Sequence, residues 1–570
     1  MTEPGPEDVA QALREGRAPS TLTDGTTDVA APVSGEPSDA PSYGGGVSVR
    51  TVGAALLEAR QAVLDEADGL PAAVVAKDVT LWGPDAASLA GTRLGWLDAV
   101  QVGRDLLPRL LALREELAAE GVDRVVLAGM GGSSLAPEVI CGTAGRPLVV
   151  LDTTDPGQVR AALTELERTV VVVSSKSGGT VETDSHRRAA RAAFELAGVD
   201  PARRIVVVTD PGSPLAATAE QEGSRAVLLA DPDVGGRYSA LTAFGLVPAT
   251  LAGVDVAALL DEAAAVLSTL GDQDGPAMAL GAVLGGAAVA GRDKLVLADG
   301  GSGVVGFGDW AEQLVAESTG KEGKGILPVV VESRDAPGTE PAADLQLVVV
   351  GGPADPLGTS VDGPLGGQFL AWEMATAVAG RALRINPFDQ PNVQESKDNT
   401  QAILDGDPPP VSAPLFVEDG VEVYATGDLL ATADTLQAAL VALLGAVPDR
   451  GYLAVMAYLD RHADSAASDL RPALAARLAH PVTFGWAPRF LHSTGQFHKG
   501  GPQVGAFLQV TGAVASDLDV PDRPYTFGQL QAAQAMGDLR ALDQRGRPVL
   551  RLHLTDRAAG LRAVLAAARG

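Results

Sequence analysis

The chain has 570 residues, of which 46% are hydrophobic and 20% are charged, and its formal net charge is −29. This length accommodates two to four domains, and the composition is that of an ordinary globular protein. A field of that sign repels nucleic acid and anionic membranes. No apolar run approaches the roughly 18 residues that a membrane-spanning helix needs.

The cysteine content and the first residues bear on the cellular compartment. Cys141 is the only cysteine, which excludes an intrachain disulfide and a cysteine-rich zinc site and suits a reducing compartment. The opening MTEPGPEDVAQALREG is acidic and lacks the apolar stretch of a secretory signal. We therefore expect a cytoplasmic protein.

Residues 1–47 are rich in Pro, Gly, Ser, Thr and Asp without apolar periodicity, and predict a disordered tail. From about residue 48 to 120 the apolar spacing is helical, as in LLEARQAVLDEADGL. Short Val, Leu and Ile runs then alternate with helix-like stretches. The runs that predict a first set of strands are 124–129, 147–152, 169–175, 204–210 and 225–231.

Further apolar runs predict a second and a third set of strands. They cover 294–300, 325–333 and 344–352, and then VEVYATG, YLAVMAYLD, PVTFGW, AFLQVTG and VLRLHLTD within 415–570. Buried strands that alternate with helices indicate parallel sheets covered on both faces. We predict an α/β fold with two doubly wound, flavodoxin-like parallel-sheet units at 48–275 and 276–405. A linker around 401–414 leads to a smaller C-terminal α/β module at 406–570.

Two loops at the ends of predicted strands carry groups that bind phosphate. They are GMGGSS at 129–134 and SSKSGGT at 174–180. Glycines let the backbone approach a ligand, hydroxyls add donors, and the following helix N-terminus adds partial positive charge. One such loop alone is usually a turn before a capped helix, but two in one sheet favour a phosphate site. Neither loop matches the nucleotide P-loop or the dinucleotide fingerprint, which disfavours ATP and NAD.

These two loops resemble those of the sugar-isomerase (SIS) domain, a flavodoxin-like module that binds phosphosugars. Three further segments narrow the resemblance to the phosphoglucose isomerase family. They are GGRYSALTAFGLVP at 235–248, GDWAEQLVAESTGKEGKGILP at 308–328 and INPFDQPNVQESK at 385–397. All five motifs follow the family's order, and the similarity looks closest to a bacterial lineage in which this unit also occurs fused to transaldolase.

The resemblance implies a role for each matching residue. Glu317 would be the catalytic base, Arg237 would stabilise negative charge on the substrate oxygens, and Glu182 would line the site. Gln390 and the catalytic Lys397 would complete the sugar pocket. The residues that would hold the phosphate are Ser133, Ser175, Lys176, Ser177 and Thr180.

The reaction that the resemblance implies suits these residue types. It interconverts glucose 6-phosphate and fructose 6-phosphate through a cis-enediolate, moving a proton between C1 and C2. A single carboxylate can take and return that proton. A nearby guanidinium or ammonium stabilises the developing oxyanion, so neither a metal nor a cofactor is expected.

The family's ring-opening histidine lies between its glutamate and lysine motifs, and this chain departs from that pattern. None of its six histidines lies between these two motifs. The C-terminal segment RFLHSTGQFHKGGPQVGAFLQV, 489–510, places histidines beside glycines. We predict that His498, with Lys499, reaches the sugar site and relays the proton. The alternative is an ordinary hydrogen-bonded loop histidine.

Other functions stay open at this point. The pocket could also accept mannose 6-phosphate, or the chain could be a non-catalytic phosphosugar-binding protein or the isomerase-like half of a split transaldolase system. The presence of Glu317, Arg237 and Lys397 together favours an enzyme. Because the family is usually dimeric, the expected partners are a phosphohexose, a second copy of the chain and, functionally, transaldolase, without nucleic acid or membrane.

Overall fold

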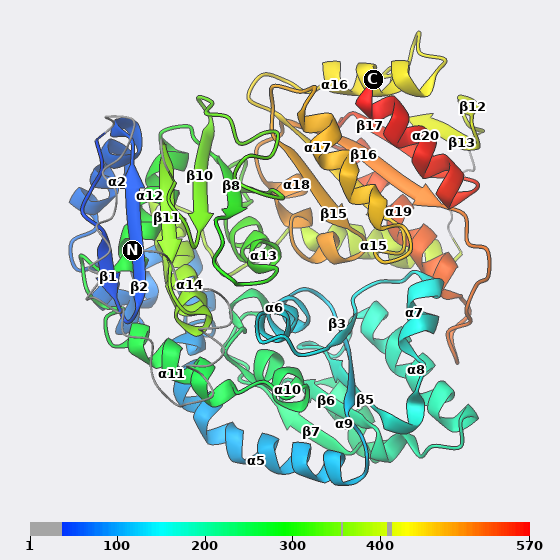
Figure 1. Cartoon of the computed structure of the whole chain (residues 1–570), viewed down its shortest axis with the longest axis horizontal. Coiled ribbons are helices and arrows are strands. Elements are labelled where there is room, and N and C mark those ends of the chain that lie inside the picture. The colour runs from blue at the N-terminus through cyan, green and yellow to red at the C-terminus, as the bar shows by residue number, and fades with distance from the viewer. Residues whose placement is uncertain (1–36, 355–356, 407–412) are drawn as a thin grey trace, which may run out of the picture.

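The computed structural model describes residues 37–354, 357–406 and 413–570, apart from the side chains of residues 393–397. Three sheets organise this part of the chain (Figure 1). Each contains parallel strands with helices packed against them, so the predicted α/β class is confirmed. Most of the predicted tail, residues 1–36, lies outside the described residues.

The first sheet is entirely parallel, in the order β4-β3-β5-β6-β7. Its strands are β3 (Arg124–Gly129), β4 (Val149–Leu151), β5 (Thr169–Ser174), β6 (Ile205–Thr209) and β7 (Ala226–Leu229). Val170 and Val172 join one hydrophobic core, whereas Val171 and Val173 join another. Successive side chains of a strand point to opposite faces, so a strand buried on both sides requires an unbroken apolar run.

Helices cover both faces of this first sheet. One face packs against α5 (Ala99–Ala119), α6 (Leu135–Thr143) and α10 (Ala243–Leu251), and α11 (Val256–Leu267) packs outside them, against α5 and α14 (Leu365–Ala382). The other packs against α7 (Pro156–Ala162), α8 (Val181–Leu196) and α9 (Pro214–Gln221). The loop after β3 leads into α6 and the loop after β5 leads into α8, so both serine-rich loops lie at the carboxyl edge of the sheet.

The second sheet has the order β1-β2-β11-β10-β8-β9. Its parallel strands are β8 (Lys294–Asp299), β9 (Leu327–Val330), β10 (Leu345–Val350) and β11 (Gly358–Asp362). Two antiparallel strands, β1 (Ser42–Gly44) and β2 (Val47–Val52), complete its edge.

This edge corrects two predictions. Residues 42–52 form strands, whereas the sequence predicted a tail up to 47 and helices from 48. They also pair with β11, which places them in the second unit and not in the first. The reason is the short alternation VSVRTV, in which Val47 and Val49 enter the core while the residues between them stay partly exposed.

The helices of the second unit pack tightly on one another. They are α2 (Ala54–Glu66), α3 (Leu70–Val75), α4 (Pro84–Ala90), α12 (Pro276–Val289), α13 (Phe307–Thr319) and α14 (Leu365–Ala382), the first three of which the sequence placed in the first unit. Helix α15 (Val393–Leu404), which the sequence placed in the second unit, packs instead on α19 (Phe527–Asp543) of the C-terminal module. Close packing of α12 on α14 depends on small residues, since a Cβ on Gly281 would lie 2.7 Å from the Ala375 carbonyl oxygen.

The third sheet has the order β12-β13-β17-β16-β14-β15. Its strands are β12 (Phe416–Glu418), β13 (Val421–Ala425), β14 (Tyr452–Tyr458), β15 (Val482–Trp486), β16 (Gly505–Gly512) and β17 (Val549–Leu554). The accompanying helices are α16 (Leu436–Gly445), α17 (Leu470–Ala475), α18 (Gly495–Gly500), α19 (Phe527–Asp543) and α20 (Arg557–Arg569). Every strand predicted in 415–570 is present, although β12 was not predicted.

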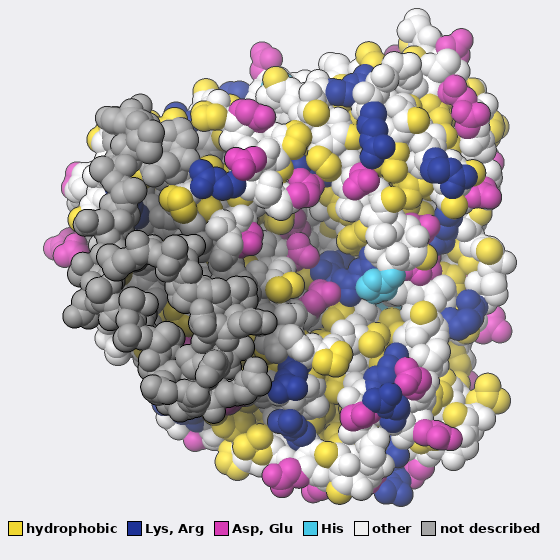
Figure 2. Space-filling model, viewed as in Figure 1, with side chains coloured by type: hydrophobic (Ala, Val, Ile, Leu, Met, Phe, Trp, Pro, Cys, Tyr) yellow, Lys and Arg dark blue, Asp and Glu magenta, His cyan; other side chains and the backbone are white. Residues whose placement is uncertain are grey.

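The C-terminal module packs directly on the second unit. Val296 and Ala298 of β8 belong to the same hydrophobic core as Tyr452 and Met456 of β14. Figure 1 shows the three units meeting around α6 and α13, and Figure 2 shows charged side chains of both signs in the hollow at this junction. No helix in the described ranges is both long and apolar enough to cross a membrane.

Candidate active site

The loop after β3 packs on the segment that carries Arg237. A Cβ on Gly132 would lie 1.9 Å from the Gly236 carbonyl oxygen, so only glycine fits at this position. Ser239 Oγ also donates to the Gly132 carbonyl oxygen at 3.2 Å. Ser133 is buried beside this contact. The first predicted phosphate loop and the predicted active-site arginine therefore belong to one site.

The loop after β5 is held in shape by its own hydroxyl groups. Ser175 Oγ and Thr180 Oγ1 lie 3.1 Å apart, and the Gly178 N–H donates to Ser175 Oγ at 3.2 Å. Thr180 immediately precedes α8, whose first N–H groups have no acceptor within the helix and carry positive potential. Ser177 is exposed at the tip of this loop. Such a loop suits an anion.

Lys176 is engaged elsewhere. Its Nζ donates to Asp210 Oδ2 at 2.6 Å and to the Pro232 carbonyl oxygen at 3.2 Å. Burial raises the pKa of Asp210, and the adjacent ammonium opposes that rise. In this structure Lys176 therefore serves as an ion-pair partner that braces the loop, whereas the sequence predicted a direct phosphate ligand.

Arg237 is 3% exposed, and its guanidinium is fixed on three sides. Nε donates to Ser318 Oγ at 2.7 Å, and Nη1 donates to Gln390 Oε1 at 2.6 Å. Nη2 donates to the carbonyl oxygens of Pro387 and Asp389 at 2.7 and 2.9 Å. A cation held in this way is preorganised to stabilise negative charge that develops beside it.

Glu317 lies near the end of α13 and is 8% exposed. Its Oε1 is 3.6 Å from Arg237 Nη1, and Gln313 Nε2 donates to its Oε2 at 3.1 Å. The same Gln313 amide donates to the His492 carbonyl oxygen at 2.8 Å. Gln313 was not predicted, although its position one helical turn before Glu317 placed it on the same face of α13.

The structure brings His492 to the site. Its Nε2 donates to Glu182 Oε1 at 3.0 Å, and Gln534 Nε2 donates to the same oxygen at 2.7 Å. A Cβ on Gly131 would lie 3.2 Å from the His492 Cβ, so this histidine packs against the first phosphate loop. Glu182 is in the first turn of α8, just beyond the second loop. His492 therefore lies between the two loops, and Gln313 links it to Glu317.

His498 does not reach this site. It is 2% exposed, and its Nδ1 lies 3.0 Å from the Tyr452 hydroxyl. Its ring packs against Tyr452, Phe490 and Phe507, with centroids 5.7, 6.4 and 5.3 Å away. Burial lowers the pKa of His498 well below the usual range, and Lys499 adds to this effect. His498 therefore agrees with the alternative prediction of an ordinary hydrogen-bonded histidine.

Lys499 also points elsewhere. Its Nζ lies 2.6 Å from Asp538 Oδ1 of α19, and both side chains are almost completely buried. Helix α18 directs His498 and Lys499 into the core of the C-terminal module, whereas His492 precedes this helix. These two residues therefore do not line the candidate site, whereas His492 does.

The last predicted motif is described in part. Gln390 contacts Arg237, as expected for a residue of the sugar pocket. The backbone of Lys397 lies in α15, but its side chain lies outside the described part of the chain. Its catalytic role stays a prediction.

Lys321, which was not predicted from the sequence, holds the backbone of the segment that leads to Gln390. Its side chain is 1% exposed, and Nζ donates to the carbonyl oxygens of Asn386 and Asp389 at 2.7 and 2.6 Å and to Asp389 Oδ1 at 2.5 Å. Burial and then Arg237 lower the pKa of Lys321 to about 8, although Asp389 opposes them. Its position in ESTGK, four residues after the predicted base Glu317, could have indicated that Lys321 lies near the site.

Comparisons with known proteins agree with this arrangement. The family model described as phosphoglucose isomerase matches residues 115–274. A probable glucose-6-phosphate isomerase from Haloarcula marismortui is 36% identical over 236 residues, which cover 40% of this chain and 53% of the relative. A glucose-6-phosphate isomerase from Rubrobacter xylanophilus is 30% identical over 376 residues, which cover 52% of this chain and 86% of the relative.

A solved structure shows the same fold. The glucose-6-phosphate isomerase from Chlamydia trachomatis superimposes with a TM-score of 0.52 and 19% identity, covering 64% of this chain and 89% of that chain. Parallel sheets with serine-rich loops around a buried arginine and glutamate define the class of phosphosugar isomerases. Within that class, the chain belongs to the phosphoglucose isomerase family of isomerases, because the Rubrobacter xylanophilus relative is matched over most of its length.

Proposed function

We propose that this protein interconverts glucose 6-phosphate and fructose 6-phosphate. The observation that carries the proposal is the buried pair of Glu317 and Arg237, 3.6 Å apart, beside a loop that can hold phosphate. Relatives that are named glucose-6-phosphate isomerases support the same substrate pair. The match spans only about half of the Haloarcula marismortui relative, and the activity of the whole chain is our inference.

Glu317 would transfer the proton between C2 and C1. The reaction passes through a cis-enediolate, so the base must remove a proton from one carbon and return it to the next. Gln313 holds one oxygen of the carboxylate by a hydrogen bond, which orients the other toward Arg237. A base oriented by a neighbouring amide can act on both carbons without moving far.

Arg237 would stabilise the enediolate oxygens. Its guanidinium is already fixed by Ser318, Gln390 and two backbone carbonyls, so it needs no reorganisation when negative charge develops. The phosphate would bind to the hydroxyls of Ser133, Ser175 and Thr180 and to N–H groups at the start of α8. These local donors offset the repulsion from a net charge of −29.

His492 would assist ring opening. Its Nε2 carries the proton donated to Glu182, which leaves Nδ1 to exchange a proton with the ring oxygen or the C1 hydroxyl. This replaces the role predicted for His498. The C-terminal module would thus supply the histidine that the family motif order places between the glutamate and lysine segments.

A coupled assay of the purified full chain with fructose 6-phosphate tests the activity. Glu317→Gln should lower kcat by about 100- to 10,000-fold, the range for loss of a general base. The matched control is Glu322→Gln, which removes an exposed carboxylate in the same segment and should leave kcat unchanged. Full activity in Glu317→Gln would contradict the mechanism, and no turnover by the wild type would favour a phosphosugar-binding protein.

Several finer expectations go with the proposal. Mannose 6-phosphate in the same assay tests a dual specificity. A homodimer, a functional association with transaldolase and a cytoplasmic location stay predictions. Sedimentation analysis of the purified chain measures the first of them.

A further inference from the structure

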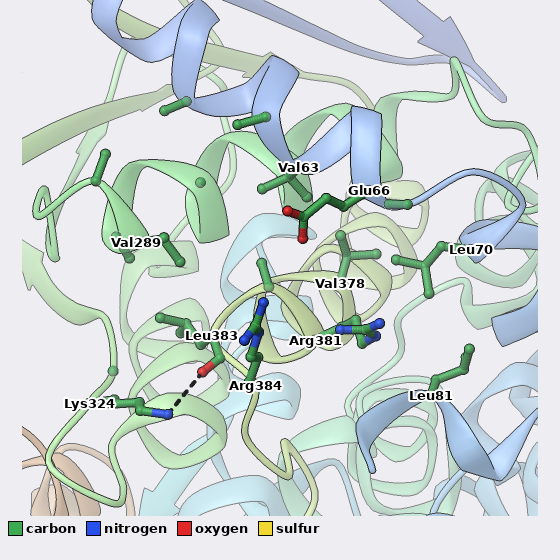
Figure 3. A pocket seen from close by; sticks show the side chains of 18 of the residues that line it. Val63, Glu66, Leu70, Leu81, Val289, Lys324, Val378, Arg381, Leu383 and Arg384 are labelled. Carbon is green, nitrogen blue, oxygen red and sulfur yellow. Dashed lines mark hydrogen bonds between the residues drawn. The ribbon is translucent and has the colours of Figure 1, made fainter.

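A cavity of about 720 Å³ lies outside the candidate active site, between α2, α12 and the end of α14. Figure 3 shows Val63 and Glu66 of α2 on one side and Arg381, Leu383 and Arg384 on the other. Its volume falls within the range of about 300–1,000 Å³ that is common for small-molecule sites.

The floor of this cavity is apolar and its rim is charged. Leu70, Val378 and Leu383 are buried against the core, and Val63 packs at its edge. Its charged lining residues are Glu66, Asp68, Asp293, Lys324, Arg381 and Arg384, and Asp293 is already paired with Lys294. An apolar body with a charged end would match both surfaces.

The two arginines are exposed residues that line the cavity, and they have no partner within the described ranges. Arg381 lies in the last turn of α14, and Arg384 follows the helix with φ 55°. No hydrogen bond or ion pair of the described residues engages either guanidinium, although Glu66 faces the same cavity (Figure 3). Lys324 Nζ donates only weakly, to the Leu383 carbonyl oxygen at 3.4 Å. Cations are favourable at a helix C-terminus, but that explains their charge and not their convergence on a cavity.

We propose that this cavity binds an amphipathic anion, with an apolar body on the Leu70 and Val378 floor and an acidic group at Arg381 and Arg384. A guanidinium presents two parallel donors that match a carboxylate, sulfonate or phosphate. The carboxylate of Glu66 on the opposite wall disfavours a second negative charge in the body of the ligand.

The residues that line the cavity are connected by hydrogen bonds to the candidate active site. A tight turn joins Lys321 and Lys324, whose N–H groups donate to each other's carbonyl oxygens at 3.1 and 2.9 Å. Lys324 contacts Leu383, and Lys321 holds Asn386 and Asp389. The backbone of this same 383–389 segment accepts two hydrogen bonds from Arg237. An anion at Arg384 would therefore act on the segment that positions Arg237, and this coupling rests on the proposed isomerase function.

The test uses 8-anilinonaphthalene-1-sulfonate (ANS), an apolar ring system with one sulfonate, and follows its fluorescence with the full-length protein. We expect saturable binding that the double substitution Arg381→Glu, Arg384→Glu weakens by about tenfold. Arg562→Glu, which reverses an exposed charge on α20, is the matched control and should leave the affinity unchanged. Equal ANS affinity in the double variant and the wild type would overturn the site.

Two further measurements separate the possible sites of the probe. N-phenyl-1-naphthylamine has the same ring system without the sulfonate, and its affinity should not respond to the arginine substitutions. Excess fructose 6-phosphate should leave ANS bound, whereas its displacement would place the probe in the sugar site and overturn the proposal. Glu66→Gln should tighten ANS binding, and weaker binding would contradict the assigned orientation.

Kinetics then test the coupling. Saturating ANS should change the KM for fructose 6-phosphate in the wild type and in Arg562→Glu, but not in the double arginine variant. An unchanged KM in the wild type would refute the coupling. If the wild type shows no isomerase activity, the proposed function fails, while the fluorescence readout still decides whether the cavity binds the anion.

Discussion

His492 and His498 show how strongly the role of a side chain depends on its neighbours. His492 meets a carboxylate, and His498 meets three aromatic rings and a tyrosine hydroxyl. The first environment supports proton transfer, because the hydrogen bond to Glu182 sets the tautomer of the ring. The second removes the ring from solvent and disfavours its charged form.

Substitution of the two histidines should therefore have different consequences. His492→Asn should lower kcat for ring-closed glucose 6-phosphate by about 100-fold or more, with a much smaller effect on an open-chain analogue. His498→Gln should lower the thermal midpoint and leave kcat per folded molecule nearly unchanged, because it disturbs packing. Steady-state kinetics and thermal unfolding of both variants measure the difference. A larger loss of kcat in His498→Gln than in His492→Asn would support His498 as the residue that relays the proton.

Glu312 predicts a pH dependence of stability. Burial, with a smaller effect from Asp309, raises its pKa from 4.5 to about 8, although Ser493 Oγ donates to its Oε1 at 3.2 Å. Between these two values the folded state holds a proton that the unfolded state releases, so stability falls as the pH rises from about 4.5 to 8.

Glu312→Gln removes this titration. Relative to the wild type, the variant should gain on the order of 1–2 kcal/mol between pH 5 and pH 8.5, since one pKa unit is worth about 1.4 kcal/mol and partial exposure reduces the effect. Thermal midpoints of both proteins at the two pH values provide the measurement. A constant difference between the two proteins across this range would show that Glu312 has an ordinary pKa.

At the scale of elements, the active site is built where loops and helix ends converge. The loop after β3 touches the segment of Arg237, and α13 brings Glu317 to the same place. The turn at Lys321 fastens the 386–389 backbone to the end of α13. The contact between Gly132 and Gly236 tolerates little displacement, because backbone atoms approach each other directly there.

Gly132→Ala tests this convergence. The new Cβ would lie 1.9 Å from the Gly236 carbonyl oxygen, so one of the two loops must move. We expect a rise of about tenfold in KM and a loss of about 1–3 kcal/mol in stability. Gly445→Ala, in a helix with open space around it, is the control and should leave KM unchanged and stability equal or higher by up to about 1 kcal/mol. Wild-type kinetics in Gly132→Ala would mean that the two loops are not coupled.

At the scale of the whole molecule, one arginine joins all three units. Arg489 of the C-terminal module pairs with Glu138 and with Asp152 of the first unit, where Nε and Oδ2 are 2.6 Å apart. Its Nη1 also lies 3.4 Å from Asp309 Oδ2 of the second unit. Burial alone would raise the pKa of Asp152, but Arg489 and then Arg461 hold it below its usual range.

Removal of this cation should therefore destabilise the assembly of the units. Arg489→Met leaves buried carboxylates without their main partner, which typically costs about 3–5 kcal/mol. The loss should be smaller at low pH, where the carboxylates accept protons and the uncompensated charge disappears. Thermal unfolding of Arg489→Met and of Arg569→Met, an exposed surface pair, measures the effect. Similar midpoints for the two variants would contradict a joining role for Arg489.

The apolar runs identified most of the parallel strands, because a strand buried on both faces must be apolar at every position. They did not reveal β1 and β12, which are three-residue edge strands, or β2 and β11, in which polar residues interrupt the apolar ones. Which sheet such a strand joins depends on a partner distant in the chain, and residues 48–52 pair with 358–362.

For the candidate site, the sequence alone determined the residue types and the motif order. It therefore indicated Arg237, Glu317, Glu182 and the two hydroxyl-rich loops. Only the tertiary structure decided that His492 meets Glu182, that Lys176 and Lys499 are paired with aspartates, and that Lys321 supports the Arg237 segment. The physical reason is that motifs report local chemistry, whereas the partner of a buried polar group is set by how separate units pack together.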